Sequence, residues 1–457
     1  MQRKMSIPIV KSTSDMYNIC TTLALQRRSR RLKQKEYALE LASCIQTDKL
    51  GYLAVLPTEI LYHAFSFLNI QDLSILTLTS KEVRDLVMEY NDTKEGFRKL
   101  MPPVTPKPPV RIIKVCLNYE KERMVHFRDA GLLMKRSTCL NPTKDRLKKV
   151  DHFISKLQNS SRFKVLSHKS MVCYGKFIST FLRGWEEKEC LRAYVSLTDV
   201  HNMTHKILTV LSRKPGYNPL LEYQIRAFFR IVLLDQCDDE EDLAMWLNFI
   251  LKPFPLVHQA RLLYLLYGPL CPEPQRKEMI NWESMSETSL LPSPPELISS
   301  FSDFATAFRA LLSHHDWNDD DVISVLEELT ACPDEWMTEN IARLLIECAD
   351  PICMRVLTSK AINGKMQELG NIIVAFAVVR FHEQMPMSWL LHLIQQICGG
   401  MKNPQDIKAF LSSISDTFKD IMMSLPEFPD DEDDLQLHHV AVAQADFMRE
   451  LLVQTFL

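Results

Sequence analysis

The sequence predicts an all-α protein, with a small three-helix module near the N-terminus followed by a large irregular or solenoid-like helical domain. Glycine is scarce, at 11 of 457 residues, whereas straight-chain residues that favour helices are plentiful. Apolar residues recur at helical spacing, and many helical segments are separated only by short Pro or Gly breaks. Barrels and sandwiches require more Gly-rich turns, so an all-α fold is favoured.

The first 50 residues are expected to form a basic segment that is partly disordered. Apolar periodicity is absent up to about residue 22, and a basic cluster follows: Arg27, Arg28, Arg30, Arg31, Lys33 and Lys35. The cluster is either a nuclear-import signal or the solvated start of a helix. Direct nucleic-acid binding is not expected, because the formal net charge of the chain is only −3.

The sequence also predicts the compartment. The N-terminus lacks the apolar run of a secretory signal, and the 12 cysteines are scattered without a CxxC pair, as in reduced intracellular proteins. The apolar run 372–379 is too short to span a bilayer, so no membrane contact is expected. We therefore expect a nuclear or cytoplasmic protein, with the nucleus favoured.

Residues 56–90 are predicted to form three short helices. Pro57 suits a first helical position, and Asn69 and Ser80 are expected to cap the second and third helices. The module carries more large apolar side chains than so small a unit can bury. Each one left in water forgoes about 1.5–3 kcal/mol. The surplus predicts a partner surface, either on another chain or on the rest of this one.

The pattern LPxEIL at 56–61, then a spaced Phe and Leu, then DL and LxLxSK resembles the F-box, the helical module that docks on the adaptor Skp1. The chain departs from many F-boxes at Val83, where they have Trp. The resemblance implies a Skp1-binding surface formed or supported by ten residues: Leu56, Pro57, Glu59, Ile60, Leu61, Phe65, Leu68, Leu73, Leu76 and Leu78.

Segments 131–148, 173–190, 250–269 and 359–365 resemble an F-box family that is connected with meiotic prophase in germ cells. This resemblance implies a non-catalytic substrate-recognition subunit of an SCF-type (Skp1–cullin–F-box) ubiquitin ligase. Its partners would be Skp1, a cullin bound through Skp1, and an unidentified protein substrate. The alternative is a non-catalytic scaffold of meiotic chromosomes with little ligase role.

The expected domains are the F-box at 51–100, a proline-rich linker at 101–115 and an α-helical substrate- or partner-binding domain at 116–457. Prolines make 102–109 stiff, although a ligand for an SH3-like domain is an alternative. Loops are expected at 272–296 and 426–434. Helix pairs favour a HEAT-like or armadillo-like solenoid, with an irregular bundle left open; the expected pairs are 241–253 with 254–268, 319–333 with 334–348, and 388–400 with 403–418.

Motifs of catalysis and cofactor binding are absent: there is no P-loop, GxGxxG, HExxH or GxSxG. His201 and His205 have the i, i+4 spacing of two ligands on one helix face, but no third ligand is recognisable. Cys348 and Cys353 are expected to be core thiols, and residues 314–317 to precede a helix capped by Asn318 or Asp319. We therefore predict no catalytic residue, metal or cofactor.

Overall fold

A computed structural model describes residues 50–101, 113–158, 168–271, 279–287, 295–382, 386–423 and 431–456. Within these ranges the regular elements are helices, and the β pairing is limited to an isolated bridge between Leu270 and Ile280. The predicted all-α class is confirmed. The chain divides into two compact units, Met1–Trp185 and Glu186–Leu457. The basic cluster at 27–35 and the prolines at 102–109 lie outside the described residues.

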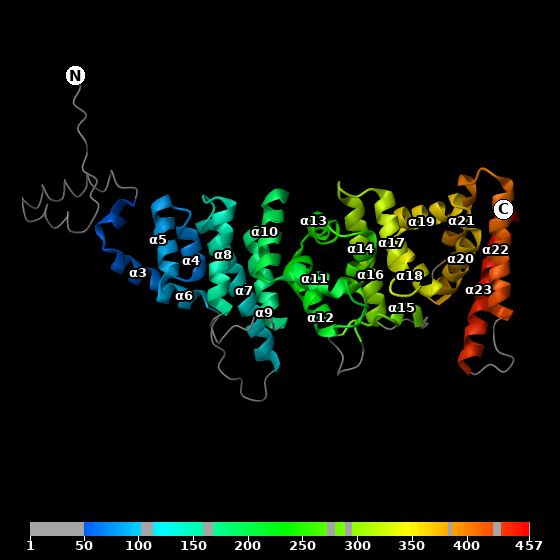
Figure 1. The fold of residues 1–457 in the computed structure, drawn as a ribbon, viewed down its shortest axis with the longest axis horizontal. Coiled ribbons are helices and arrows are strands. Elements are labelled where there is room, and N and C mark those ends of the chain that lie inside the picture. The colour runs from blue at the N-terminus through cyan, green and yellow to red at the C-terminus, as the bar shows by residue number, and fades with distance from the viewer. Residues whose placement is uncertain are drawn as a thin grey trace, which may run out of the picture. The chain divides into compact units, whose positions relative to one another are not determined.

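The first unit contains the N-terminal three-helix module and the helices that pack against it (Figure 1). Its elements are a 3₁₀ turn η1 (Gly51–Val55), α3 (Thr58–Phe67), α4 (Ile70–Leu76), α5 (Lys81–Asp92), α6 (Lys94–Leu100), α7 (Ile113–Ser137), α8 (Thr143–Gln158) and α9 (His168–Leu182). Helix α7 packs on α9 and on α4. The compact units therefore divide after α9, further along the chain than the proline-rich stretch.

Two predicted caps explain why the module has three separate helices. The Asn69 side chain accepts a hydrogen bond from the backbone N–H of Asp72 at 2.7 Å, and the Ser80 hydroxyl accepts one from Val83 at 3.1 Å. Each bond satisfies an amide that has no partner within its helix. Pro57 is the residue before α3 rather than its first residue.

The second unit is built from a longer succession of helices (Figure 1). They are α10 (Glu187–Val200), α11 (Met203–Leu211), α12 (Pro219–Ala227), a π-helical turn η2 (Phe228–Leu233), a 3₁₀ turn η3 (Leu234–Gln236), α13 (Glu240–Leu251), α14 (Leu256–Tyr267), α15 (Ser284–Glu287), α16 (Pro295–Ser313), α17 (Asp319–Thr330), α18 (Thr338–Cys348), α19 (Asp350–Ile362), α20 (Met366–His382), α21 (Ser388–Gly400), α22 (Pro404–Met423) and α23 (Asp431–Phe456). None of the described helices has the length and apolar character needed to cross a membrane.

From α13 onward the helices form two rows. In one row each helix packs on the next in the order α13, α16, α18, α20 and α22, and in the other row the order is α14, α17, α19, α21 and α23. Neighbours in sequence join the rows as pairs, namely α13 with α14, α16 with α17, α18 with α19, α20 with α21, and α22 with α23. Stacked helix pairs of this kind are a solenoid, so the structure favours the solenoid over the irregular bundle.

Two of the three expected helix pairs are wrong. The sequence predicted α13 with α14 correctly, but it joined α17 to α18 and α21 to α22. In the structure α17 pairs with α16 and α18 with α19, while α21 pairs with α20 and α22 with α23. The connections between repeats at 363–365 and 401–403 are as short as those within a repeat, although the one at 268–294 is much longer. Chain breaks alone therefore could not show where one repeat ends.

Part of the expected surface loop at 272–296 is buried. Ile280, Trp282 and Met285 are at most 6% exposed. The Trp282 ring stacks on Tyr264 at 4.7 Å, and its Nε1–H donates to Glu222 Oε2 at 3.0 Å. Because most of the segment is polar, the sequence did not indicate that these few apolar residues are buried. Of the expected acidic loop at 426–434, residues 426–430 lie outside the described ranges, and α23 begins at Asp431.

Candidate partner-binding site

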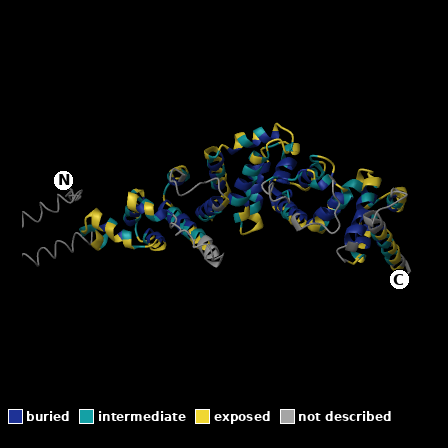
Figure 2. Cartoon of the chain, turned by 90° about the horizontal axis from the view of Figure 1, so that it is seen from below, coloured by how far each residue is buried: buried dark blue, intermediate teal, exposed yellow. Residues whose placement is uncertain are grey.

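Large apolar side chains remain exposed on the first elements of the chain, where exposed residues are frequent (yellow in Figure 2). We call them the exposed apolar set: Tyr52, Leu53, Leu56, Ile60, Phe67, Ile75 and Leu78. Tyr52 and Phe67 are 82% and 78% exposed. So many apolar side chains within one short stretch indicate an interaction surface, because isolated exposed residues do not gather in this way.

Helix α4 has two different faces. Ile70 and Leu73 are buried, and α7 packs on this part of the module. Ile75 is 56% exposed, and Leu78, in the turn that follows α4, is 55% exposed. Ile70 and Leu73, three positions apart, share the helix face that this chain buries, whereas Ile75 lies on the face that stays open.

Polar contacts fix α4 to α7. Gln71 Nε2 donates to Asp129 Oδ2 at 2.7 Å, and Arg136 Nη1 donates to the hydroxyl of Ser74 at 3.0 Å. Ser74 is 1% exposed and Asp129 is 7% exposed, so both acceptor groups are buried. Helix α7 therefore holds the module in place from one side and leaves its other side uncovered.

The end of α3 is anchored from inside the module. Phe65 packs edge-on against Tyr90 of α5, with ring centroids 5.7 Å apart. The Lys99 ammonium of α6 donates to the backbone carbonyls of Phe65 at 2.8 Å and Ser66 at 2.9 Å, and also to that of Leu68. Burial lowers the pKa of Lys99. These contacts hold α3 in place while Ile60, on the same helix, stays half exposed.

The ten residues assigned to Skp1 binding from sequence fall into three groups. Leu56, Pro57, Glu59, Ile60 and Leu78 are exposed; Leu68 and Leu76 are half-buried; Leu61, Phe65 and Leu73 are buried. The exposed group is placed to touch a partner, and the buried group supports the module from within. Their assignment to Skp1 stays a prediction.

The remaining exposed apolar residues were missed from sequence: Tyr52, Leu53, Phe67 and Ile75. Tyr52 and Leu53 precede the motif, while Phe67 lies off the apolar stripe of α3. That off-stripe position was the signal that could have found Phe67. Val83, the departure from the F-box pattern, is 5% exposed and belongs to the interior of the module.

The two histidines that stand at i, i+4 in the sequence, His201 and His205, do not lie on one helix. His201 is the residue after α10 and His205 lies within α11, with Asn202 between the helices at a φ of 54°. The left-handed residue turns the chain, so the two imidazoles do not share one regular helix face. The i, i+4 argument for two ligands therefore fails.

A different group brings Glu187, His314 and His315 together, with one ligand atom of each within 4.8 Å of the others. The backbone N–H of Asp316 donates to His314 Nδ1 at 3.2 Å. This places the proton of the neutral ring on Nε2, the atom that lies 3.7 Å from Glu187 Oε1. In the structure the contact is an imidazole–carboxylate pair.

The other sequence-based candidates are structural. Cys348 and Cys353 are buried, and burial raises the pKa of the Cys348 thiol to about 12. A protonated thiol is a poor nucleophile and a poor metal ligand. Residues 314–317 precede α17, whose cap is Asn318; its side chain accepts from the backbone N–H of Asp321 at 2.7 Å.

Comparison with known proteins decides the family. The chain is 37% identical to F-box only protein 47 of Mus musculus over 424 residues, which are 89% of this chain and 90% of that protein. It is 35% identical to F-box only protein 47 of Homo sapiens over 452 residues, 94% of this chain and 95% of that protein. The chain belongs to the F-box only protein 47 family. The F-box resemblance found in the sequence is thus confirmed at the level of the family.

A family model described as "FBXO47, ARM repeats" matches residues 200–456. The match begins close to the start of the second compact unit at Glu186 and contains both rows of helices. The second unit of this F-box only protein 47 family member is therefore largely an ARM-repeat domain. No solved structure matches the chain.

Proposed function

We propose that this member of the F-box only protein 47 family is the substrate-recognition subunit of an SCF-type ubiquitin ligase in meiotic germ cells. The N-terminal module binds Skp1 and through it a cullin, and the helical remainder holds a protein substrate. The observation that carries the proposal is the exposed apolar set on a module whose other face is already packed on α7.

Such a subunit acts by position. It holds a substrate lysine near the thioester of a conjugating enzyme and so raises the effective concentration of the two reactants. The chain needs a docking surface and a firm scaffold for this role, but no reactive side chain of its own. The α4–α7 hydrogen bonds and the Lys99 anchor supply such a scaffold for the module.

The test is the double variant Leu56→Ala with Pro57→Ala. Both side chains are exposed, so the fold should be unaffected. Burial of one leucine contributes about 1.5–3 kcal/mol, so we expect co-purification of Skp1 to weaken at least about tenfold. The matched control is Leu140→Ala, at a residue 66% exposed in the same compact unit but outside the module. Unchanged Skp1 recovery with the double variant would contradict the proposal.

The scaffold alternative is separated by what accompanies Skp1. A ligase subunit carries a cullin in the native assembly, and its substrate accumulates when residues 51–100 are deleted. A chromosome scaffold retains its partners at unchanged levels after the same deletion. Val83 does not favour the scaffold, because it is buried and takes no area from the exposed surface.

The nucleus is the proposed site of action, supported by the basic cluster at 27–35. Replacing Arg27, Arg28, Arg30 and Arg31 by Ala should shift a fluorescent fusion of the chain to the cytoplasm. The matched control replaces Lys402 and Lys408 of the second unit by Ala. An unchanged nuclear fraction would remove the import role.

A further inference from the structure

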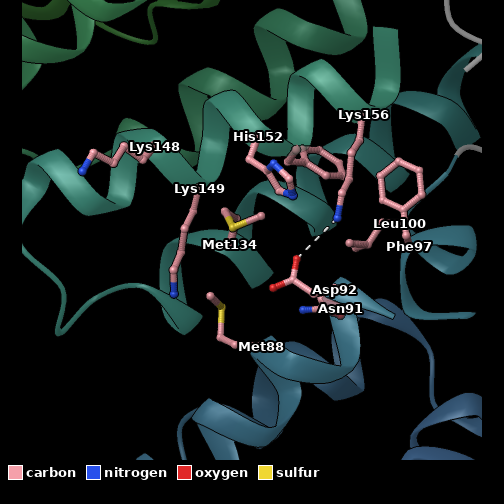
Figure 3. A pocket seen from close by; sticks show the side chains of 11 residues that line it. Met88, Asn91, Asp92, Phe97, Leu100, Met134, Lys148, Lys149, His152 and Lys156 are labelled. Atoms are coloured by element: carbon pink, nitrogen blue, oxygen red, sulfur yellow. Dashed lines mark ion pairs between the residues drawn. The ribbon is translucent and has the colours of Figure 1, made fainter. Parts of the chain in front are cut away.

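A hollow of about 270 Å³ lies in the first compact unit, between the end of α5, α6, α7 and α8 (Figure 3). Its apolar lining comes from four helices and consists of Met88, Phe97, Leu100, Met134 and Phe153. Sites for drug-sized ligands and cofactors begin at about 300 Å³. This hollow is smaller, and its size suits one or two amino-acid side chains.

Asn91 supplies an unpaired polar group at this place. Its side chain is 8% exposed and lines the hollow, and its Oδ1 has no hydrogen-bond partner among the described residues. Buried amide oxygens without a partner are rare in folded proteins, and each requires an explanation. A ligand that brings an N–H donor into the hollow would complete this bond.

The rim of the hollow is basic. Helix α8 contributes Lys149, His152 and Lys156, and the opposing carboxylate is Asp92. Lys156 Nζ pairs with Asp92 Oδ1 at 3.6 Å and lies 5.6 Å from the centre of the Phe97 ring. Figure 3 shows Lys149 extending toward Met88. Lys149 has no ion-pair partner in the part of the chain that the structure describes, so its charge is free to meet an anion.

Lys148 also belongs to the lining, but it contributes less. Its Nζ pairs with Asp145 of the same helix at 3.5 Å, and in Figure 3 its side chain points away from the centre of the hollow. The charge that faces a ligand is therefore positive and is carried mainly by Lys149.

We propose that this hollow binds a short acidic peptide segment of a partner protein. One bulky apolar side chain of the peptide fills the hollow, against the apolar lining that includes Met88 and Phe153. A backbone N–H of the peptide donates to Asn91 Oδ1. Asp or Glu side chains next to that anchor lie against Lys149. That the partner is a ligase substrate rests on the function proposed above; the peptide site itself does not.

A larger hollow of about 680 Å³ lies in the second unit, but it is a weaker candidate for a binding site. It lies among α18, α20, α22 and α23, and three of its polar side chains already bond to one another. Thr417 Oγ1 donates to Asn371 Oδ1 at 2.9 Å, and Gln367 Nε2 donates to Asn371 Oδ1 and Thr417 Oγ1, both at 3.3 Å. These groups need no ligand to complete their hydrogen bonds, whereas Asn91 does.

The experiment uses the full chain to select from a displayed library of random peptides of about ten residues, a length that spans roughly 30 Å when extended. Two variants change the hollow, Asn91→Leu and Lys149→Glu. The matched control is Lys144→Glu, the same charge reversal at an exposed position of α8 outside the lining. Thermal unfolding of each variant shows that it is folded.

We expect the wild-type chain to enrich peptides with one bulky apolar residue flanked by Asp or Glu. A synthetic peptide from this set should bind at least about tenfold more weakly to both hollow variants and equally well to Lys144→Glu, because the variants remove an acceptor or reverse a charge. Asn91→Leu should not lower the unfolding temperature, since it removes an unpaired buried group. Enrichment of other sequences, no enrichment, or equal binding by Lys149→Glu would overturn the proposal.

Skp1 recovery is measured on the same variants to keep the two proposals apart. Asn91→Leu should retain Skp1, because Asn91 is buried and does not belong to the exposed apolar set. Loss of Skp1 binding in the Leu56→Ala, Pro57→Ala variant with peptide binding intact would support both assignments. Peptide binding without any Skp1 binding by the wild-type chain would remove the ligase role and leave the peptide site standing.

Discussion

At the scale of single residues, burial sets the chemistry of several side chains. His201 packs against Phe228, with ring centroids 5.0 Å apart, and burial lowers the pKa of the imidazole to about 4, with a smaller contribution from Lys206. An unfolded histidine has a pKa near 6.5. Between these values the unfolded chain binds more protons than the folded chain, so acid favours unfolding.

The resulting prediction concerns the second compact unit. Between pH 7 and pH 5 its free energy of unfolding should fall by about 1–2 kcal/mol through His201. A His201→Gln variant should show a shallower pH dependence, because its amide does not titrate. Urea unfolding at a series of pH values measures both slopes. Equal slopes for the two proteins would contradict this assignment.

At the scale of elements, α4 connects the core with the proposed docking surface. Leu73 is 1% exposed on the face toward α7, and Ile75, two residues later, is 56% exposed. The two positions share the same helix but have opposite surroundings. They therefore separate a role in stability from a role in binding.

Leu73→Ala should lower the free energy of unfolding of the first unit by about 2–5 kcal/mol, because it leaves a cavity beneath α7. Ile75→Ala should change it by less than about 0.5 kcal/mol and should weaken Skp1 binding instead. Chemical denaturation and a binding titration on both variants give the four values. A similar stability loss for both variants would mean that the outer face of α4 is already covered.

The elements themselves were largely predictable, because their signals are local. Asn69, Ser80 and Asn318 cap the helices that the sequence assigned to them, and the first helix pair of the repeats was placed correctly. These local signals do not predict structure that depends on packing between segments far apart in the sequence. The later helix pairs, for example, depend on how the repeats stack.

The candidate sites show the same limit. The F-box motif indicated the module but could not divide its apolar residues into core and surface, because α7 lies far along the chain and covers one face of α4. The hollow around Asn91 brings together side chains of α5, α6, α7 and α8. No spacing in the sequence marks it, since its members join only through tertiary packing.

At the scale of the whole molecule, the chain consists of two compact units that divide after Trp185. Each unit has its own buried aromatic residues, such as Phe177 in the first and Phe304 in the second. We therefore predict that residues 1–185 and 186–457 fold when produced separately. Circular dichroism with thermal melting tests this prediction, and a half that fails to melt cooperatively would show that the units depend on each other.

The same division assigns the proposed Skp1 contact to the first unit alone. Residues 1–185 should bind Skp1 as tightly as the full chain does, because the exposed apolar set lies entirely within them. A titration of both proteins with Skp1 measures the two affinities. Binding that requires residues 186–457 would place part of the contact on the repeats.

Hydroxyl-radical footprinting of the full chain with and without purified Skp1 tests the central claim most directly, because it reports the exposure of individual side chains. Tyr52, Leu56, Ile60, Phe67 and Ile75 should become protected by Skp1. Tyr217, which is 68% exposed in the second unit, should remain reactive. Unchanged labelling of the first group in a sample saturated with Skp1 would contradict the account.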